Sequence, residues 1–204
     1  MLGSDKENKS MKHQITREDL MPLDQYASER RDHGRRIAEI KKHRRVAVGP
    51  DAMFYFENFD TMWFQIHEML HIEKGGDEQV DGELEAYNPL IPKGNELVAT
   101  MMIEIPDPDR RAAVLAKLGG IEETASLVIN GETINGVPEE DTDRTNADGK
   151  ASSVQFIHFS LTDAQTAAFQ SSGAEVVLAL SHPEYHHMAG LPEETRKALS
   201  GDLN

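Results

Sequence analysis

The most regular pattern of apolar positions in the chain follows residue 58. Apolar residues recur there every three or four positions, which predicts an amphipathic helix from residue 61 to about residue 73. Asp60 is the predicted N-cap, because its side chain can accept hydrogen bonds from the first turn, and Gly75 and Gly76 end the helix. The apolar stripe consists of Phe59, Met62, Met69 and three residues that we expect to be buried, Trp63, Ile66 and Leu70.

The rest of the N-terminal part is predicted to be helical with one β-hairpin. Residues 1–14 are polar and unpatterned, which is typical of a disordered tail or a remnant of an expression vector. A surface helix is predicted over residues 24–43, and strands at 45–48 and 53–57 are joined by a Gly-Pro-Asp sequence that favours a tight turn. A further helix is predicted over residues 77–88.

From residue 97 the apolar positions alternate with a period of two, which predicts strands. With residues 126–134 counted as one hairpin, the order of elements is β-α-β-β-α-β. This order is typical of a ferredoxin-like split βαβ unit with helices on one face of an antiparallel sheet. Residues 182–188, which contain three histidines, are expected to be a polar connector after the last strand. The predicted strands are 97–105, 126–129, 132–134, 153–161 and 175–180, and helices follow Asp107 and Thr162.

These elements predict an α+β fold. Residues 15–94 contribute the N-terminal helices and the β-hairpin, and residues 95–204 contribute the β-α-β-β-α-β elements, packed together as one compact unit. The apolar content of 38% is low, but it is sufficient for a core of this kind.

Composition and charge narrow the possible functions. The net charge of −15 argues against nucleic acid as a general partner, because its phosphates would be repelled. The chain has no Cys, which excludes disulfides, thiol catalysis and Cys-ligated metal centres. No apolar run approaches the roughly 18 residues of a membrane span and there is no signal-peptide pattern, so we expect a cytoplasmic protein without membrane contact.

The basic residues are concentrated between residues 26 and 45. Such a concentration can bind a small anion or an acidic partner. The alternative is a solvated helix whose basic side chains pair with acids of the protein itself. The candidate anion-binding residues are Arg30, Arg31, Arg35, Arg36, Lys41 and Lys42.

The one chemical motif in the chain is an H-E-x-x-H sequence formed by His67, Glu68 and His71. Histidines four positions apart project from the same side of a helix, where they can bind zinc, and the glutamate would then be the general base for a metal-bound water. The alternative is that both histidines are half-exposed helix residues beside the apolar stripe. A zinc site would need a third ligand, for which the candidates are Glu83, Glu85, His158 and His186.

Several short runs of sequence resemble a known family. The most specific runs are residues 86–92 and 99–106. Residues 20–26 and Glu57 also resemble the family. Together they resemble the bacterial family known as domain of unknown function 3501 (DUF3501), over nearly the whole chain. The resemblance implies no assigned activity.

The resemblance also bears on partners and on zinc. Genes of the family often lie beside genes for rubrerythrin-like and iron–sulfur proteins, which implies a role near a redox or peroxide-stress system. In the family pattern the positions of His67 and His71 are commonly Gln and Arg, whereas the Glu68 position is kept. The resemblance therefore implies that the H-E-x-x-H sequence is particular to this chain.

The function predicted from the sequence is that of a non-catalytic accessory or binding protein beside a redox or peroxide-stress system. No cofactor is predicted for this function. The alternatives are a zinc-dependent hydrolase that uses His67, Glu68 and His71, and a small-anion binding module that uses the basic helix 26–45.

Overall fold

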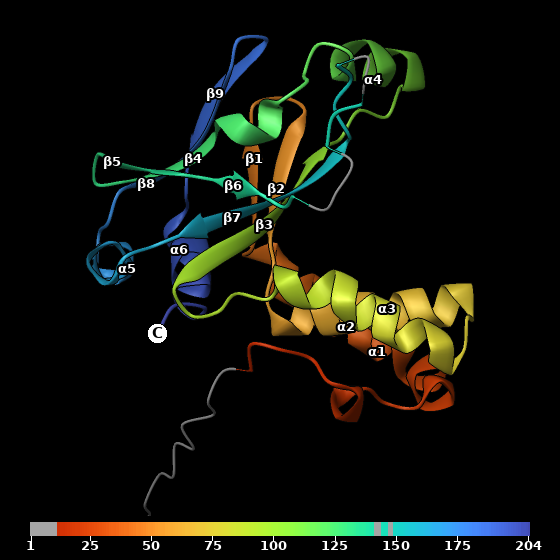
Figure 1. Ribbon diagram of the computed structural model, residues 1–204. Coiled ribbons are helices and arrows are strands. Elements are labelled where there is room, and N and C mark those ends of the chain that lie inside the picture. Colours follow the sequence, from red (N-terminus) through yellow and green to blue (C-terminus); the bar gives the residue numbers. More distant parts are fainter. Residues whose placement is uncertain (1–11, 141–143, 147–148) are drawn as a thin grey trace, which may run out of the picture.

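Two antiparallel β-sheets and the helices around them form an α+β fold, as predicted (Figure 1). This computed structural model describes residues 12–140, 144–146 and 149–204, so most of the predicted tail, residues 1–11, lies outside the described residues. Sheet A has the order β1 (Arg45–Val48), β2 (Ala52–Phe56), β3 (Glu96–Ile103), β7 (Val154–Ser160) and β6 (Val137–Pro138). Sheet B has the order β5 (Glu132–Asn135), β4 (Ala125–Ile129), β8 (Val176–His182) and β9 (Tyr185–Gly190).

The long helices gather at one end of the sheets (Figure 1). They are α1 (Leu23–Lys42), α2 (Phe59–Glu73) and α3 (Asp77–Tyr87), with the short 3-10 helices η1 (Arg17–Asp19) and η2 (Asn88–Leu90). The remaining helices are α4 (Pro108–Leu115), η3 (Ile121–Thr124), α5 (Asp163–Gln170) and α6 (Glu193–Ser200).

Helix α2 begins two residues earlier than predicted. The N-cap is Asn58 and not Asp60, because the Asn58 side chain accepts a hydrogen bond of 3.0 Å from the Thr61 backbone N–H. The Thr61 hydroxyl in turn accepts from the Asn58 N–H, which completes a reciprocal cap. At the other end Lys74 adopts a left-handed conformation and stops the helix before the two glycines.

The main core fills the space between the inner faces of the two sheets. Sheet A contributes large side chains that are fully buried, and sheet B contributes aliphatic side chains from its two central strands. The principal members are Phe54, Phe56, Leu97, Met101, Phe159, Leu127, Ile129, Leu178 and Leu180.

A second core lies between the helices and the outer face of sheet A. Ile66 and Leu70 of α2 are buried there as predicted, together with Val98 of β3. Trp63 is only half-buried, because its indole N–H reaches out to donate a hydrogen bond of 2.8 Å to the Asp19 carbonyl. The other members of this core are Ile15, Met62, Leu90 and Ile91.

The ferredoxin-like arrangement was not confirmed. A split βαβ unit would place its four strands in one sheet, whereas β3 pairs with β7 in sheet A and β4 pairs with β8 in sheet B. The free side of β3 is taken by β2 of the N-terminal hairpin, with Phe54 opposite Met101. The predicted strands and helices occur in the predicted order, with β6 and β9 in addition, but that order does not determine which strands become neighbours.

The expected polar connector at residues 182–188 was also wrong, since β9 pairs with β8 there and forms a hairpin. The Tyr185 hydroxyl donates to the Val48 carbonyl at 2.8 Å and accepts from the backbone N–H groups of Asp51 and Ala52, both at 2.9 Å. These bonds hold the β8–β9 hairpin against the β1–β2 turn. Gly49 in that turn has a φ of +73°, and a Cβ there would lie 2.7 Å from the same hydroxyl.

A buried ion pair joins the start of β1 to the C-terminal residues. The Arg44 guanidinium pairs with Asp202 and also donates to the backbone carbonyls of Phe56, at 2.9 Å, and Glu57, at 3.0 Å. Burial raises the pKa of the Asp202 carboxyl, although Arg44 opposes the shift. Each of the three guanidinium nitrogens has an acceptor, the third backbone carbonyl being that of Ala198, so the pair is compatible with the interior.

Truncation of α2 tests how the helices are held on sheet A. We expect Leu70→Ala to lower the free energy of unfolding by about 2–5 kcal/mol, because it opens a cavity where only 3% of the side chain is exposed. Ile72→Ala on the same helix is the matched control, since Ile72 is 62% exposed and its truncation should change stability by less than about 0.5 kcal/mol. Urea unfolding measures both, and equal effects would contradict the assignment of the buried face.

Candidate functional site

His67 is held by backbone groups on both sides of its ring. Its Nδ1–H donates to the Trp63 carbonyl at 2.7 Å, and its Nε2 accepts from the Met21 N–H at 3.1 Å. The residue is fully buried, so the expectation that it would be half-exposed was wrong. Burial lowers the pKa of His67, which favours the neutral ring that these two bonds require. The ring therefore connects α2 to the segment that precedes α1.

Glu68 also has partners on α1. It accepts hydrogen bonds from the Tyr26 hydroxyl at 2.6 Å and from the Arg30 guanidinium at 2.8 and 2.7 Å. The Arg30 hydrogen bonds lower the pKa of Glu68, so the carboxylate is charged at neutral pH. In this arrangement Glu68 joins the two helices, and its oxygens are directed at protein donors.

The residues of the H-E-x-x-H sequence are not brought together with a third ligand. No group of three or more His, Asp or Glu side chains could hold a metal ion within the described residues. Zinc at His67 would displace one of its two hydrogen bonds. The half-buried His71 lies beside the Tyr26 ring, with centroids 6.1 Å apart.

The candidate third ligands lie elsewhere. Glu83 accepts a hydrogen bond from Gln79 on α3, and Glu85 is exposed on the same helix. His186 is exposed on β9. His158 on β7 lies between Glu96, at 3.0 Å, and Glu139, at 2.9 Å. Burial lowers the pKa of His158, but the two carboxylates outweigh it and the net shift is upward.

Three of the four arginines of α1 are paired within the protein. Their guanidinium groups form ion pairs with acids on α1 and α2: Arg30 with Glu68, Arg35 with Asp32 and Arg36 with Asp60. Arg31 and Lys42 are exposed. Lys41 differs from both, because it is half-buried at the edge of a cavity.

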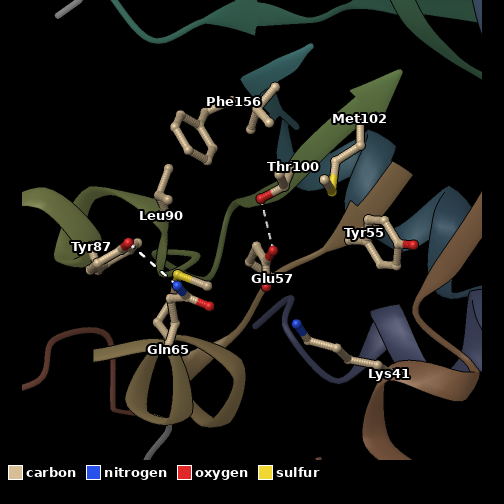
Figure 2. A pocket seen from close by; sticks show the side chains of 11 residues that line it. Lys41, Tyr55, Glu57, Gln65, Tyr87, Leu90, Thr100, Met102 and Phe156 are labelled. Carbon is tan, nitrogen blue, oxygen red and sulfur yellow. Dashed lines mark hydrogen bonds between the residues drawn. The ribbon is translucent and has the colours of Figure 1, made fainter. Parts of the chain in front are cut away.

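This cavity, here called the outer-face pocket, lies between the outer face of sheet A and the helices (Figure 2). Its volume is about 280 Å³. Strands β2, β3 and β7 supply one wall, α2 and η2 with the end of α3 supply another, and Lys41 stands at the end of α1. The strand residues are Tyr55, Thr100, Met102, Val154 and Phe156, and the helix residues are Met62, Gln65, Tyr87 and Leu90.

Glu57 is the buried carboxylate of the outer-face pocket, with 4% of the residue exposed. One oxygen accepts from the Thr61 hydroxyl at 2.6 Å, and the other accepts from the Thr100 hydroxyl at 2.8 Å. Figure 2 shows the Thr100 bond as a dashed line across the pocket. Within the part of the chain that the structure describes, no Lys, Arg or His forms an ion pair with this carboxylate.

Two tyrosines present neutral hydroxyls around the pocket. Burial raises the pKa of Tyr55 to about 12, and its hydroxyl donates to Glu104 at 2.6 Å. Burial also raises the pKa of Tyr87, whose hydroxyl lies 3.5 Å from the Gln65 amide (Figure 2). The ionic groups of the pocket are therefore one carboxylate and one ammonium, and the rest of its lining is apolar or neutral.

The sequence did not identify this pocket, although it contained three partial signals. Lys41 was among the candidate anion-binding residues, and Glu57 was among the residues of the family resemblance. The third signal is that large apolar or aromatic residues follow one another along the strands. Because successive side chains point to opposite faces, Tyr55, Met102 and Phe156 had to lie on the face away from the inner core.

Comparison with known proteins places the chain in a family. The family model described as "Protein of unknown function (DUF3501)" matches residues 14–203. The chain belongs to the DUF3501 family. This confirms the resemblance found in the sequence.

The DUF3501 chain is also similar to a solved structure, described as a novel protein of unknown function from Burkholderia pseudomallei K96243. The two chains are 38% identical with a TM-score of 0.86, and the match covers 93% of this chain and 99% of the other. A comparison with curated proteins gives no significant match. Among the helices of the described residues, none is long and apolar enough to cross a membrane.

The pH dependence of stability tests the buried, neutral state of His67. The unfolded chain binds a proton near the ordinary pKa of 6.5, whereas the folded pKa is lower. The stability that His67 contributes is therefore complete above about pH 6.5 and is lost as pH falls toward the folded pKa. We expect the stability difference between wild type and His67→Gln to shrink on acidification, measured by urea unfolding between about pH 5 and 7.5.

Other titrating groups are shared by wild type and variant and cancel in this difference. His158 is one of them, and because its pKa is raised, its effect on stability has the opposite pH dependence. Its contribution to stability is present below about pH 6.5 and is lost as the pH rises through the pKa of the folded state. A wild type and variant that differ by the same amount at every pH would contradict the buried, neutral assignment.

Zinc analysis addresses the metal alternative separately. Because both ring nitrogens of His67 already have backbone partners, we expect protein purified without an affinity tag to contain far less than equimolar zinc. Atomic emission spectrometry measures the content. Equimolar zinc that disappears in His67→Gln would contradict this expectation and would favour the hydrolase.

Proposed function

We propose that this protein is a non-catalytic binding protein that holds one small ligand in the outer-face pocket. The observation that carries the proposal is the buried Glu57 carboxylate within a cavity of about 280 Å³ whose other walls are largely apolar. Ligand sites in proteins combine apolar walls with a few polar groups in fixed positions, and this pocket has both. Thr61 and Thr100 fix the carboxylate before any ligand arrives.

The lining of the pocket favours binding over catalysis. It contains no His, Ser or Cys, and the hydroxyls of Tyr55 and Thr100 and the carboxylate of Glu57 already form hydrogen bonds within the protein. Each oxygen of Glu57 already accepts a hydrogen bond from a threonine hydroxyl of the protein, so the carboxylate is positioned to orient a ligand. Glu68, the other candidate base, is directed at Tyr26 and Arg30.

An accessory role in the cytoplasm, beside a rubrerythrin or iron–sulfur redox system, remains part of this proposal because the family resemblance implies it. The pocket supports ligand binding and has no bearing on the identity of a protein partner. A redox partner therefore stays a prediction that is separate from the pocket.

Filling the pocket with a larger side chain tests the proposal. Wild-type protein should bind small aromatic probes such as phenol or indole, observed by saturation-transfer NMR. Val154→Phe, which places a ring in the pocket from β7, should weaken this binding about tenfold or more. Val137→Phe is the matched control, because Val137 lies on β6 of the same sheet with 59% of its surface exposed, and it should bind the probes as wild type does.

Thermal unfolding of the three proteins shows whether each variant is folded before binding is compared. Failure of the wild type to bind any such probe would contradict the proposal. Equal binding by Val154→Phe and wild type would show that the probes bind at another place on the protein.

A further inference from the structure

We infer that the outer-face pocket takes a small zwitterion with an apolar side chain, of the class of the hydrophobic α-amino acids. This inference rests on the proposed function and names the ligand class for the same pocket. It depends on three features of the lining: the buried carboxylate of Glu57, the ammonium of Lys41 and the apolar side chains between the sheet and the helices.

The Glu57 carboxylate has room for a cationic donor. A carboxylate accepts about four hydrogen bonds, and here each oxygen has one hydroxyl donor. A carboxylate that is buried without a positive partner is unfavourable, and among the described residues no cation forms an ion pair with Glu57. The ammonium of a ligand would supply both the missing charge and the missing donors.

Lys41 provides the opposite charge. It is half-buried at the edge of the pocket, and among the residues that the structure covers it has no acidic partner within ion-pair distance. Figure 2 shows its side chain extending from the end of α1 toward the part of the pocket that holds Glu57. Lys42, which belongs to the same last turn of the helix, is exposed to solvent and does not line the pocket. A carboxylate of the ligand would find its cation at Lys41.

The two charges exclude simpler ligands. A plain amine would bring a second positive charge near Lys41, and a plain carboxylate would bring a second negative charge near Glu57. A zwitterion satisfies both ends, and its side chain would lie against Leu90, Met102 and Phe156. The volume of about 280 Å³ is just below the range of roughly 300–1,000 Å³ that is usual for drug-sized ligands, so a small molecule fits best.

Three compounds that share a benzyl side chain test the inference by isothermal titration calorimetry. L-Phenylalanine has both charged groups, phenethylamine lacks the carboxylate, and hydrocinnamate lacks the ammonium. We expect L-phenylalanine to bind at least about tenfold more tightly than either analogue. L-Leucine, isoamylamine and isocaproate form a second set with a smaller side chain, so that a ring too large for the pocket does not decide the result.

Variants assign the two charges. Glu57→Gln and Lys41→Met should each weaken the preferred amino acid about tenfold or more, whereas Lys42→Met should bind it as wild type does. Binding of indole by each variant shows that the pocket is still formed. Retained indole binding with lost amino-acid binding is the expected result for the first two variants.

Two outcomes would overturn the inference while leaving the proposed function intact. One is binding of indole by wild type without any preference for the amino acids over their amine and acid analogues. The other is unchanged amino-acid affinity in both Glu57→Gln and Lys41→Met. Absence of binding by every compound, indole and phenol included, would overturn the proposed function as well.

Discussion

The architecture depends on sheet A being covered on both of its faces. Strand β3 buries Leu97 and Met101 on the inner face and Val98 on the outer face, so neither face can be left entirely to water. Sheet B packs against the inner face, and the two sheets share the main core. The helices lie at one end of the outer face (Figure 1), and the outer-face pocket is lined by residues of both the helices and the sheet. The outer-face pocket is thus a product of how the layers meet, and its polar groups lie at their junction.

Polar contacts hold the helical layer together and give the H-E-x-x-H residues a structural role. Glu68 accepts hydrogen bonds from Tyr26 and Arg30 of α1, and His67 accepts one from the N–H of Met21 just before that helix. A buried imidazole with both nitrogens satisfied costs little desolvation free energy as long as it stays neutral. The H-E-x-x-H sequence is therefore compatible with a helix–helix interface as well as with a zinc site. Only the hydrogen-bond partners of its side chains distinguish the interface from the zinc site.

The sequence predicted most features whose causes are local, with the N-cap of α2 as an exception. The caps at Asp107 and Thr162 are formed by hydrogen bonds within one turn. The predicted strands 126–129 and 132–134 are joined by Asn130 and Gly131, which both adopt positive φ. The pairing of β3 with β7 joins segments about fifty residues apart. The periodicity of a strand does not determine which other strand it pairs with. Strand β9 was missed because its exposed residues, including His186 and His187, show no apolar alternation. The buried state of His67 depends on Met21, which is 46 positions away.

The pocket was beyond prediction for the same reason. Its two charged residues, Lys41 and Glu57, come from different elements, and each could be singled out in the sequence only as a member of a larger set. Lys41 and Glu57 line one cavity because α1 and β2 pack close together at the outer face of sheet A. Periodicity along the chain carries no information about that meeting of distant elements.

The buried pair of Arg44 and Asp202 has a consequence for the cooperativity of folding. The two residues are 158 positions apart, so the ion pair closes a long loop of the chain. If the residues after α6 detached, the Arg44 guanidinium would keep only backbone carbonyls as partners, and a buried charge without its counter-ion is strongly destabilising. The start of β1 and the residues after α6 therefore depend on each other, and local opening of one segment destabilises the other.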